Sequence, residues 1–436
     1  MLSMNAADLF AQAQEFAKKF YWGQVIKICE QGVAIEKTNA RWHYLLAKAH
    51  TMRFDYAKAA KAALLGRNCD KRFANYQQKW IARESSKLFQ TIDPEDAQDA
   101  INIQTKFPSQ PPEWWIACYH KLFHTGAVAQ AYQAKQRAAQ IYVDRHELEN
   151  RAPTVTYVRA LVLLGAYRAA QRQAAKLAAK HAMDGKKDLN LLQLSAYSAI
   201  ASGAGKSALN VLSPEGEGRA FDALVRGKSV AIVGPASTQE RWGEEIESFD
   251  VVIRPGITSP MPADMQTTLG SRSDAVYYNG PDEIDHSDKI RELLQNNQIG
   301  MAVLRTPNLM SSGVYSGLSA RLNSTIIKFW ECDFGLLGVP KILWDVLKFS
   351  PRRIKVFNSD FYSTPTPYRD GYRADEKDNI RKRTLARHDL IENYVLCQHL
   401  FGENLFEADP KLEALLRLPL GIYLERLGVA FRSTAN

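Results

Sequence analysis

A turn of glycine, proline and hydroxyl-bearing residues near the middle of the chain is composed like a phosphate-binding turn. Residues 229–233 (SVAIV) resemble a buried strand, Gly234 and Pro235 form the turn, and Ser237 and Thr238 precede a helix-like stretch. Backbone amides at a helix start, helped by the helix dipole and two hydroxyls, would form a site for an anion such as a nucleotide phosphate. An ordinary strand–turn–helix connection is the alternative, because the GxGxxG pattern is absent.

The elements that would hold this turn belong to an α/β domain predicted for residues 228–436. Apolar runs that resemble buried strands alternate with helix-like stretches, which predicts a largely parallel sheet covered by helices. Ligands of such sheets lie beyond the carboxyl ends of the strands. The predicted strands are 230–234, 250–254, 274–278, 300–305 and 354–357, and the predicted helices are 238–248, 288–297, 336–349 and 384–402.

Residues 1–212 have apolar residues at helical spacing and few β-branched runs, so a purely helical domain is expected there. Trp22 and Val25 recur as Tyr56 and Ala59, 34 residues later. That period resembles tetratricopeptide repeats, and such arrays bind protein partners. A scaffold that docks on the second domain without a ligand of its own is the alternative. Residues 213–227 are expected to be the linker between the two domains.

Four segments of the second domain, in order, resemble the sialylmotifs of glycosyltransferase family 29, the animal-type sialyltransferases. The segment VAIVG…GEEIES-FDVVIR is similar to the large motif. The residues that match it are Gly234, Gly243, Glu245, Ile246, Asp250, Val252 and Arg254.

The other three motifs follow between residues 269 and 400. LGSRSDAVYYN resembles the strand that ends at a donor-contacting asparagine, here Asn279. Gly335 corresponds to the glycine of the small motif, and Asp333 stands where the family has a Ser/Thr pair. ARHDLIENYVLCQHL resembles the very short motif, which implies that His388 is the catalytic base and that Glu392 assists it.

This resemblance implies a Rossmann-like, GT-A-type catalytic domain that transfers a nonulosonic acid, such as a sialic acid or Kdo, from a CMP-activated donor. The transfer would be inverting, with His388 accepting the proton of the acceptor hydroxyl, because imidazole titrates near neutrality. A helix-flanking surface histidine is the alternative for His388, and a solvent-facing side chain for Glu392. The resemblance also implies donor contacts by Gly234, Arg254, Asn279, Asp333 and Gly335, with Ser237 and Thr238 beside the first turn.

The expected acceptor is a glycan or glycolipid of bacterial capsule or lipopolysaccharide assembly. The group that assists CMP departure is unassigned, and three residues are candidates by location, Tyr368, Arg369 and Tyr372. Pro255 and Asp333 depart from the family pattern, so a different nucleotide sugar is an alternative. The alternative from another class is a non-catalytic repeat scaffold that binds an anionic partner.

The 436 residues carry a net charge of +9, which favours anionic partners without choosing among them. Five scattered cysteines without a CxxC pair indicate neither a disulfide framework nor a zinc site. No metal is expected, since no Asp-x-Asp follows a predicted strand, and no cofactor is expected. No nucleic-acid partner is expected either, because no recognition motif for nucleic acid is present. Without a signal peptide or membrane span, the expected location is the cytoplasm, with peripheral association at the inner membrane. The exact sugar, the linkage and the oligomeric state do not follow from the sequence.

Overall fold

The computed structural model forms two compact units, Met1–Ile141 and Tyr142–Asn436. The division falls inside the helix α9 (Val128–Leu148). The residues that the structure describes are 5–18, 21–52, 58, 61–62, 65–66, 69–70, 111–124, 126–184, 188–212, 218–257, 259, 261–323, 325–331, 335–365, 368–369, 372 and 389–432.

The first unit is helical in its described part, as expected. Trp42 and Val25 are fully buried in its core, and Phe10 meets the Trp42 ring edge-on at 4.9 Å between centroids. A Cβ at Gly32 would collide with the Trp42 ring, so the glycine lets two helices approach closely. The second copy of the repeat, Tyr56 and Ala59, lies outside the described residues. The helices are α1 (Ala6–Lys18), α2 (Trp22–Ile35), α3 (Ala40–Met52) and α8 (Pro112–His124), followed by the start of α9.

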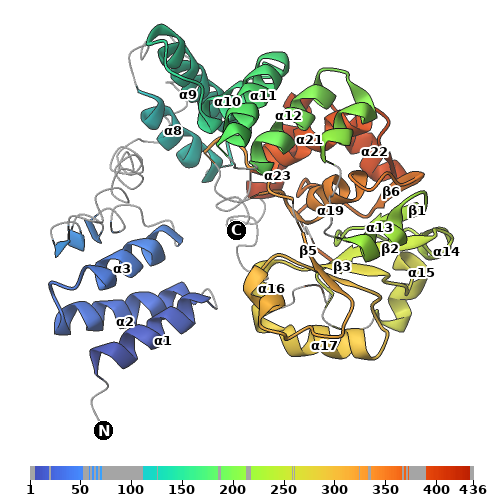
Figure 1. The fold of residues 1–436 in the computed structure, drawn as a ribbon, viewed down its shortest axis with the longest axis horizontal. Helices are drawn as coiled ribbons and strands as arrows, with labels where there is room; N and C mark the ends of the chain where they lie inside the picture. The colour runs from blue at the N-terminus through green and yellow to red at the C-terminus, as the bar shows by residue number, and fades with distance from the viewer. Residues whose placement is uncertain are drawn as a thin grey trace. The chain divides into compact units, whose positions relative to one another are not determined.

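The second unit begins with further helices and continues into a sheet (Figure 1). Thr154 caps the helix α10 (Val155–Leu163) by accepting a hydrogen bond from the Tyr157 amide. Asp188 caps the helix α12 (Leu189–Ala201) in the same way, by accepting from the Leu191 amide. The helical elements before the sheet are α10 (Val155–Leu163), α11 (Tyr167–Met183), α12 (Leu189–Ala201), the 3-10 segment η3 (Gly205–Leu212) and α13 (Arg219–Val225). The helix α13 occupies part of the predicted linker 213–227, with Phe221 and Val225 buried, and residues 213–217 lie outside the described residues. The predicted domain boundaries stay a prediction.

Seven parallel strands form one sheet in the order β5-β4-β3-β2-β1-β6-β7, which confirms the predicted parallel α/β arrangement. All five predicted strands are present, and two short strands, β5 and β7, were not predicted. The strands are β1 (Ser229–Val233), β2 (Val251–Pro255), β3 (Ala275–Tyr277), β4 (Ala302–Leu304), β5 (Ala320–Leu322), β6 (Arg353–Phe357) and β7 (Glu407–Ala408).

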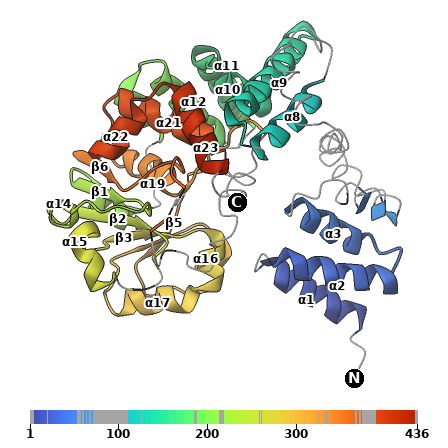
Figure 2. The same cartoon turned by 180° about the vertical axis from the view of Figure 1, so that it is seen from behind.

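Helices cover both faces of the sheet, and Figure 2 shows the same layers from behind. On one face Val252 and Phe357 pack with α14 and α15, and Val276 packs with α17. Alternation along the strands turns Ile253 to the opposite face, where α19 contacts β1 and β2. The helices are α14 (Gly243–Glu247), α15 (Gln266–Leu269), α16 (Gly280–Asp285), α17 (Ser287–Gln295), α18 (Pro307–Ser311), α19 (Gly338–Leu347), α21 (Leu390–Gly402), α22 (Pro410–Leu416) and α23 (Leu420–Arg432), with the short 3-10 turn η4 (Ala263–Met265).

The helix predicted for 238–248 is much shorter in the structure, because α14 begins only at Gly243. Upstream of the predicted helix, the Ala236 amide donates to the carbonyl oxygen of Asn358 at 3.0 Å. Residues 238–242 are not helical, although their amphipathic pattern favours a helix. In the described part of the chain, no helix is both long and apolar enough to cross a membrane.

Candidate functional site

The strand order reverses direction beside β1, because β2 pairs with one side of it and β6 with the other. In open parallel sheets, ligands bind at this point, beyond the carboxyl ends of the two strands that flank it. Gly234 directly follows β1, and Asn358 directly follows β6. A Cβ at Gly234 would collide with the carbonyl oxygen of Asn358, so the glycine is needed where the two segments meet.

The backbone of the predicted phosphate-binding turn is already hydrogen-bonded to β6 and the residue after it. The Gly234 amide donates to the Phe357 oxygen at 2.8 Å, the Ala236 amide donates to Asn358, and Pro235 has no amide proton. No helix begins at Ser237 or Thr238. The structure therefore has no helix-start amides at this turn, although both hydroxyl residues lie at the expected edge of the sheet, and anion binding by Ser237 and Thr238 stays a prediction.

A small pocket does open at this place, and it is called the switch-point pocket below. Its cavity volume is about 20 Å³, which is room for one water-sized group, so a larger ligand would extend across the open edge. Both Ser237 and Thr238 line it. The lining residues are Ala236, Ser237, Thr238, Glu240, Trp242, Asn358, Ser359, Asp360, Asp409 and Lys411.

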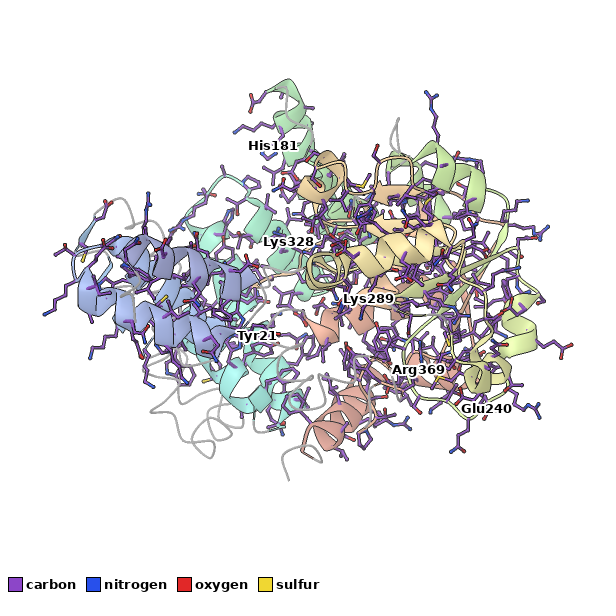
Figure 3. All side chains as sticks on the ribbon, turned by 90° about the horizontal axis from the view of Figure 1, so that it is seen from below. Tyr21, His181, Glu240, Lys289, Lys328 and Arg369 are labelled. Atoms are coloured by element: carbon purple, nitrogen blue, oxygen red, sulfur yellow. The ribbon has the colours of Figure 1, made fainter. Side chains whose placement is uncertain are left out.

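Arg369 places a positive charge beside the same turn. Its amide donates to the Pro235 oxygen at 2.9 Å, and its Nη1 donates to the Gly234 oxygen at 3.4 Å. The guanidinium lies 5.2 Å from the centroid of the Tyr372 ring and is half-buried. Arg369 is labelled in Figure 3. Burial lowers its pKa, and the nearby Tyr372 opposes that shift. Among the described residues no carboxylate pairs with Arg369, so a half-buried cation stands here without a counter-charge.

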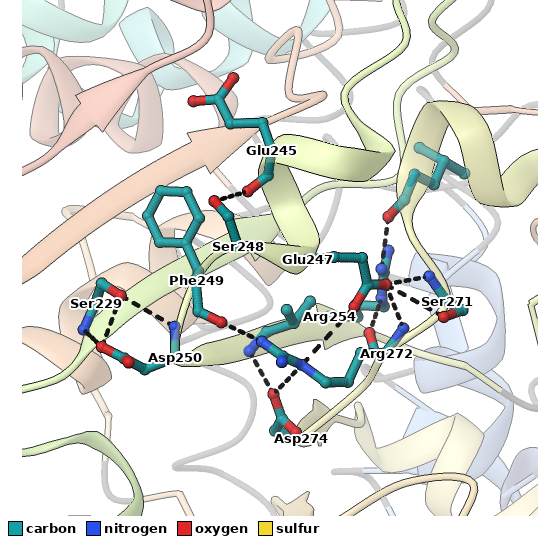
Figure 4. Close-up of polar contacts among 12 residues, drawn as sticks. Ser229, Glu245, Glu247, Ser248, Phe249, Asp250, Arg254, Ser271, Arg272 and Asp274 are labelled. Carbon is teal, nitrogen blue, oxygen red and sulfur yellow. Dashed lines mark hydrogen bonds and ion pairs between the residues drawn. The ribbon is translucent and has the colours of Figure 1, made fainter.

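Arg254 adds a second guanidinium close by, and Figure 4 shows its polar surroundings. Its side chain is 1 % exposed and donates to the backbone oxygens of Leu269 at 2.6 Å and Arg272 at 2.9 Å. Its pKa is lowered to about 10, first by burial and then by the charge of Arg369, while Glu247 opposes the shift. Its Nη1 finds no hydrogen-bond partner in the described part of the chain. Both guanidinium groups therefore remain charged at neutral pH.

Several residues that match the large motif have structural tasks in this fold. A Cβ at Gly243 would collide with the Gln266 oxygen, and Glu245 pairs with Lys355 at 2.5 Å. Asp250 accepts from both the amide and the hydroxyl of Ser229, each at 2.7 Å, which ties the starts of two strands together. Two further residues that match the motif, Ile246 and Val252, are buried in the core. These residue types therefore follow from the requirements of the fold.

The predicted third and fourth motif segments meet near the end of β2. A Cβ at Gly338, the first residue of α19, would lie 3.6 Å from the Pro255 side chain. The Leu337 amide beside it donates to Oδ1 of Asn393 at 2.9 Å, and Asn393 is fully buried in the first turn of α21. Gly335 precedes this contact by two residues. The structure thus brings the small-motif glycine and the start of α21 to the carboxyl edge of the sheet.

The remaining predicted site residues fall in three different settings. Asn279 follows β3 and caps α16, accepting from the Asp282 amide at 3.0 Å. Glu392 is 1 % exposed in α21, and its charge raises the pKa of Tyr167 on α11, an effect second to burial. His388 and Asp333 lie outside the described residues. Within the described ranges, no group of three or more His, Cys, Asp or Glu side chains is placed to hold a metal ion.

Asn358 is a polar residue of this edge that the sequence reasoning did not select. A signal was present, since the polar residues Asn358–Asp360 (NSD) directly follow the predicted strand 354–357. Its Nδ2 is buried without a hydrogen-bond partner in the described part of the chain.

Comparisons with known proteins give little to set beside this geometry. No family model matches the chain, and no curated protein matches it. Among solved structures, a mutant form of the O-GlcNAc transferase of Thermobaculum terrenum is 11% identical, with 94% of this chain and 75% of that chain covered. The TM-score of this match is 0.20, so the likeness carries no argument about this chain.

Proposed function

We propose that the chain is a glycosyltransferase that binds a nucleotide-activated sugar at the carboxyl edge of β1, β2 and β6. One observation carries the proposal. Arg369 is a half-buried cation without a carboxylate partner among the described residues, and it lies beside the reversal of strand order, where parallel sheets bind ligands. A buried charge is costly until it is paired, and an anionic phosphate would pair it.

The second guanidinium supports the same conclusion. The charge of Arg369 lowers the pKa of Arg254, which means that the two cations repel each other. A phosphate near both would relieve this repulsion. We therefore propose that Arg369 stabilises the negative charge on the departing nucleotide. The sequence had named Arg369 for this role by its location only.

The donor that we propose is a CMP-activated nonulosonic acid, and the fold that we propose is a GT-A-type catalytic domain. In this mechanism His388 removes the proton of the acceptor hydroxyl as that oxygen attacks the anomeric carbon, and the nucleotide leaves with the bonding electrons. The ordered motif resemblance from Gly234 to Glu392 supports this assignment. The N-terminal helices are proposed to be a tetratricopeptide-like array that recruits a protein partner or a glycolipid acceptor.

Two variants test the proposal by release of CMP from CMP-sialic acid or CMP-Kdo in the presence of candidate glycans. We expect His388→Ala to abolish release and Arg369→Gln to reduce it by about 10- to 100-fold, as for loss of a charge-assisted hydrogen bond of about 1.5–3 kcal/mol. Arg352→Gln is the matched control, because Arg352 is exposed just before the opposite end of β6. Full activity of His388→Ala would contradict the assignment of the base.

A further inference from the structure

One side of the helix α11 carries regularly spaced cations. Its 17 residues include two arginines and two lysines and contain no Asp or Glu. Each of these cations follows the previous one by four residues, so together they extend over about 18 Å and about a third of the helix circumference. All four side chains are exposed. The set, called the α11 stripe below, consists of Arg168, Arg172, Lys176 and Lys180.

The α11 stripe lies on the face of the helix that is turned away from its neighbours. Ala170 and Ala174 are fully buried on the inner face, and α11 contacts α10 and α12. Arg172 lies about 200° around the helix axis from Ala170, so it is on the opposite side. Met183 lies about three turns after Arg172, on the same side, and is 82 % exposed. The outward face therefore combines cations with one exposed apolar side chain.

The fold itself makes no use of these charges. In the described part of the chain, no carboxylate forms an ion pair with the α11 stripe, whereas Arg417 elsewhere in the same unit pairs with Glu413 one turn earlier at 2.8 Å. Like charges four residues apart destabilise a helix. The helix dipole favours cations at the C-terminal end, which accounts for Lys180 but not for Arg168 in the first turn. The α11 stripe therefore needs a reason outside the stability of the chain.

The partner that fits this face supplies negative charge along the helix and an apolar phase beside Met183. A free nucleotide is too short to reach the whole α11 stripe, and a nucleic-acid backbone offers charge without an apolar phase. A bilayer with anionic lipid offers both, because its charged headgroups lie directly above the acyl chains. Most residues between the cations are alanine, so no bulky side chain prevents the helix from lying flat. Long Arg and Lys side chains then reach the headgroups.

We propose that α11 binds the surface of a membrane that contains anionic phospholipid. The helix lies parallel to the membrane, with the α11 stripe on the headgroups and Met183 at the boundary of the acyl chains. This binding involves neither the switch-point pocket nor Arg369, so it is independent of the proposed function. Loss of lipid binding and loss of nucleotide binding are therefore separate results.

The test is sedimentation of the full chain with vesicles of phosphatidylglycerol and phosphatidylcholine in equal parts, and with vesicles of phosphatidylcholine alone. Arg172→Gln/Lys176→Gln removes the centre of the α11 stripe, and glutamine keeps a high helix propensity. Arg219→Gln/Lys289→Gln is the matched control, because it removes two exposed cations from α13 and α17. Urea unfolding should show that the stripe variant is at least as stable as wild-type protein, because like-charge contacts are removed.

We expect wild-type protein and the control to bind the anionic vesicles, and the stripe variant to bind about 30-fold more weakly, as for two cations near an anionic surface. Added salt should weaken the binding, and phosphatidylcholine alone should not support it. Met183→Ser should weaken binding about 3- to 10-fold. Val429→Ser, which changes an exposed apolar residue of α23, should leave it unchanged.

Three results would overturn the inference. The first is equal binding of the stripe variant and its control to anionic vesicles, or no binding by wild-type protein. The second is unchanged affinity of Met183→Ser, because charge alone would then account for the binding. The third is tighter binding of the wild-type protein to duplex DNA or to polyglutamate than to the vesicles, which would identify a nucleic acid or an acidic protein as the partner.

Discussion

A buried ionic network beneath the sheet allows a quantitative prediction about stability. Asp345 on α19 is fully buried, and its carboxylate receives Lys348 at 2.6 Å, the Tyr277 hydroxyl at 2.7 Å and the guanidinium of Arg321 from β5. The Arg321 guanidinium also stacks on the Phe221 ring at 3.8 Å. One carboxylate therefore pairs with two cations, Arg321 from β5 and Lys348 from the end of α19.

We predict that Asp345→Asn lowers the free energy of unfolding by about 3–5 kcal/mol at pH 7, because removal of one partner leaves buried charge uncompensated. The pKa of Asp345 supports this scale. Burial raises it, but Lys348 and Arg321 bring it down to about 2 from a reference of 3.8. That difference corresponds to roughly 2.5 kcal/mol. Because the folded-state pKa is depressed, the contribution is present above about pH 4 and is lost as the pH falls towards 2.

The assay is urea or guanidinium unfolding followed by circular dichroism, with linear extrapolation to water. Asp222→Asn is the matched control, since Asp222 forms an exposed pair with Arg226 at 2.7 Å that we expect to contribute little to stability. Adding Lys348→Met to Asp345→Asn should recover part of the loss by removing one of the two buried cations. A loss below about 1 kcal/mol for Asp345→Asn, equal to the control, would refute the reasoning.

Three further predictions concern a glycine, a histidine and a thiol. A Cβ at Gly243 would collide with the Gln266 oxygen, so Gly243→Ala should lower stability by about 1–3 kcal/mol in thermal unfolding, whereas Gly421→Ala, with open space, should change it little. Burial lowers the pKa of His399, so stability should fall as the pH drops below about 6.5, and His399→Gln should flatten that slope; an unchanged slope would contradict this. Burial raises the pKa of the Cys397 thiol, so it should resist alkylation in the native protein and react after unfolding.

The sequence predicted the sheet well because parallel strands buried on both faces read as continuous apolar runs. The missed strands are Ala320–Leu322 and Glu407–Ala408, which lie at the two edges and are too short to show periodicity. The helix predicted for 238–248 was too long, since the helix begins only at Gly243 although the amphipathic pattern starts at residue 238. The spacing of apolar residues does not by itself locate the first helical residue.

The position of the candidate site could be predicted from the sequence, but the hydrogen bonding and burial of its residues could not. Parallel topology puts the ends of β1, β2 and β3 at one edge, so Gly234, Arg254 and Asn279 share it as the sequence indicated. The hydrogen bonds of Arg254 and Arg369 to backbone oxygens depend on the folding of distant segments, as does the lack of a carboxylate partner for Arg369 among the described residues. The position of Asn358 directly after a buried strand was visible in the sequence, but that position alone does not show that the side chain is buried.

The most direct test of the central claim is calorimetric titration of CMP into wild-type protein, Arg369→Gln and the control Arg352→Gln. The account predicts saturable binding to wild-type protein and to the control, with affinity about 10- to 100-fold lower for Arg369→Gln. No binding of CMP to wild-type protein, or equal affinity for wild-type protein and Arg369→Gln, would contradict it.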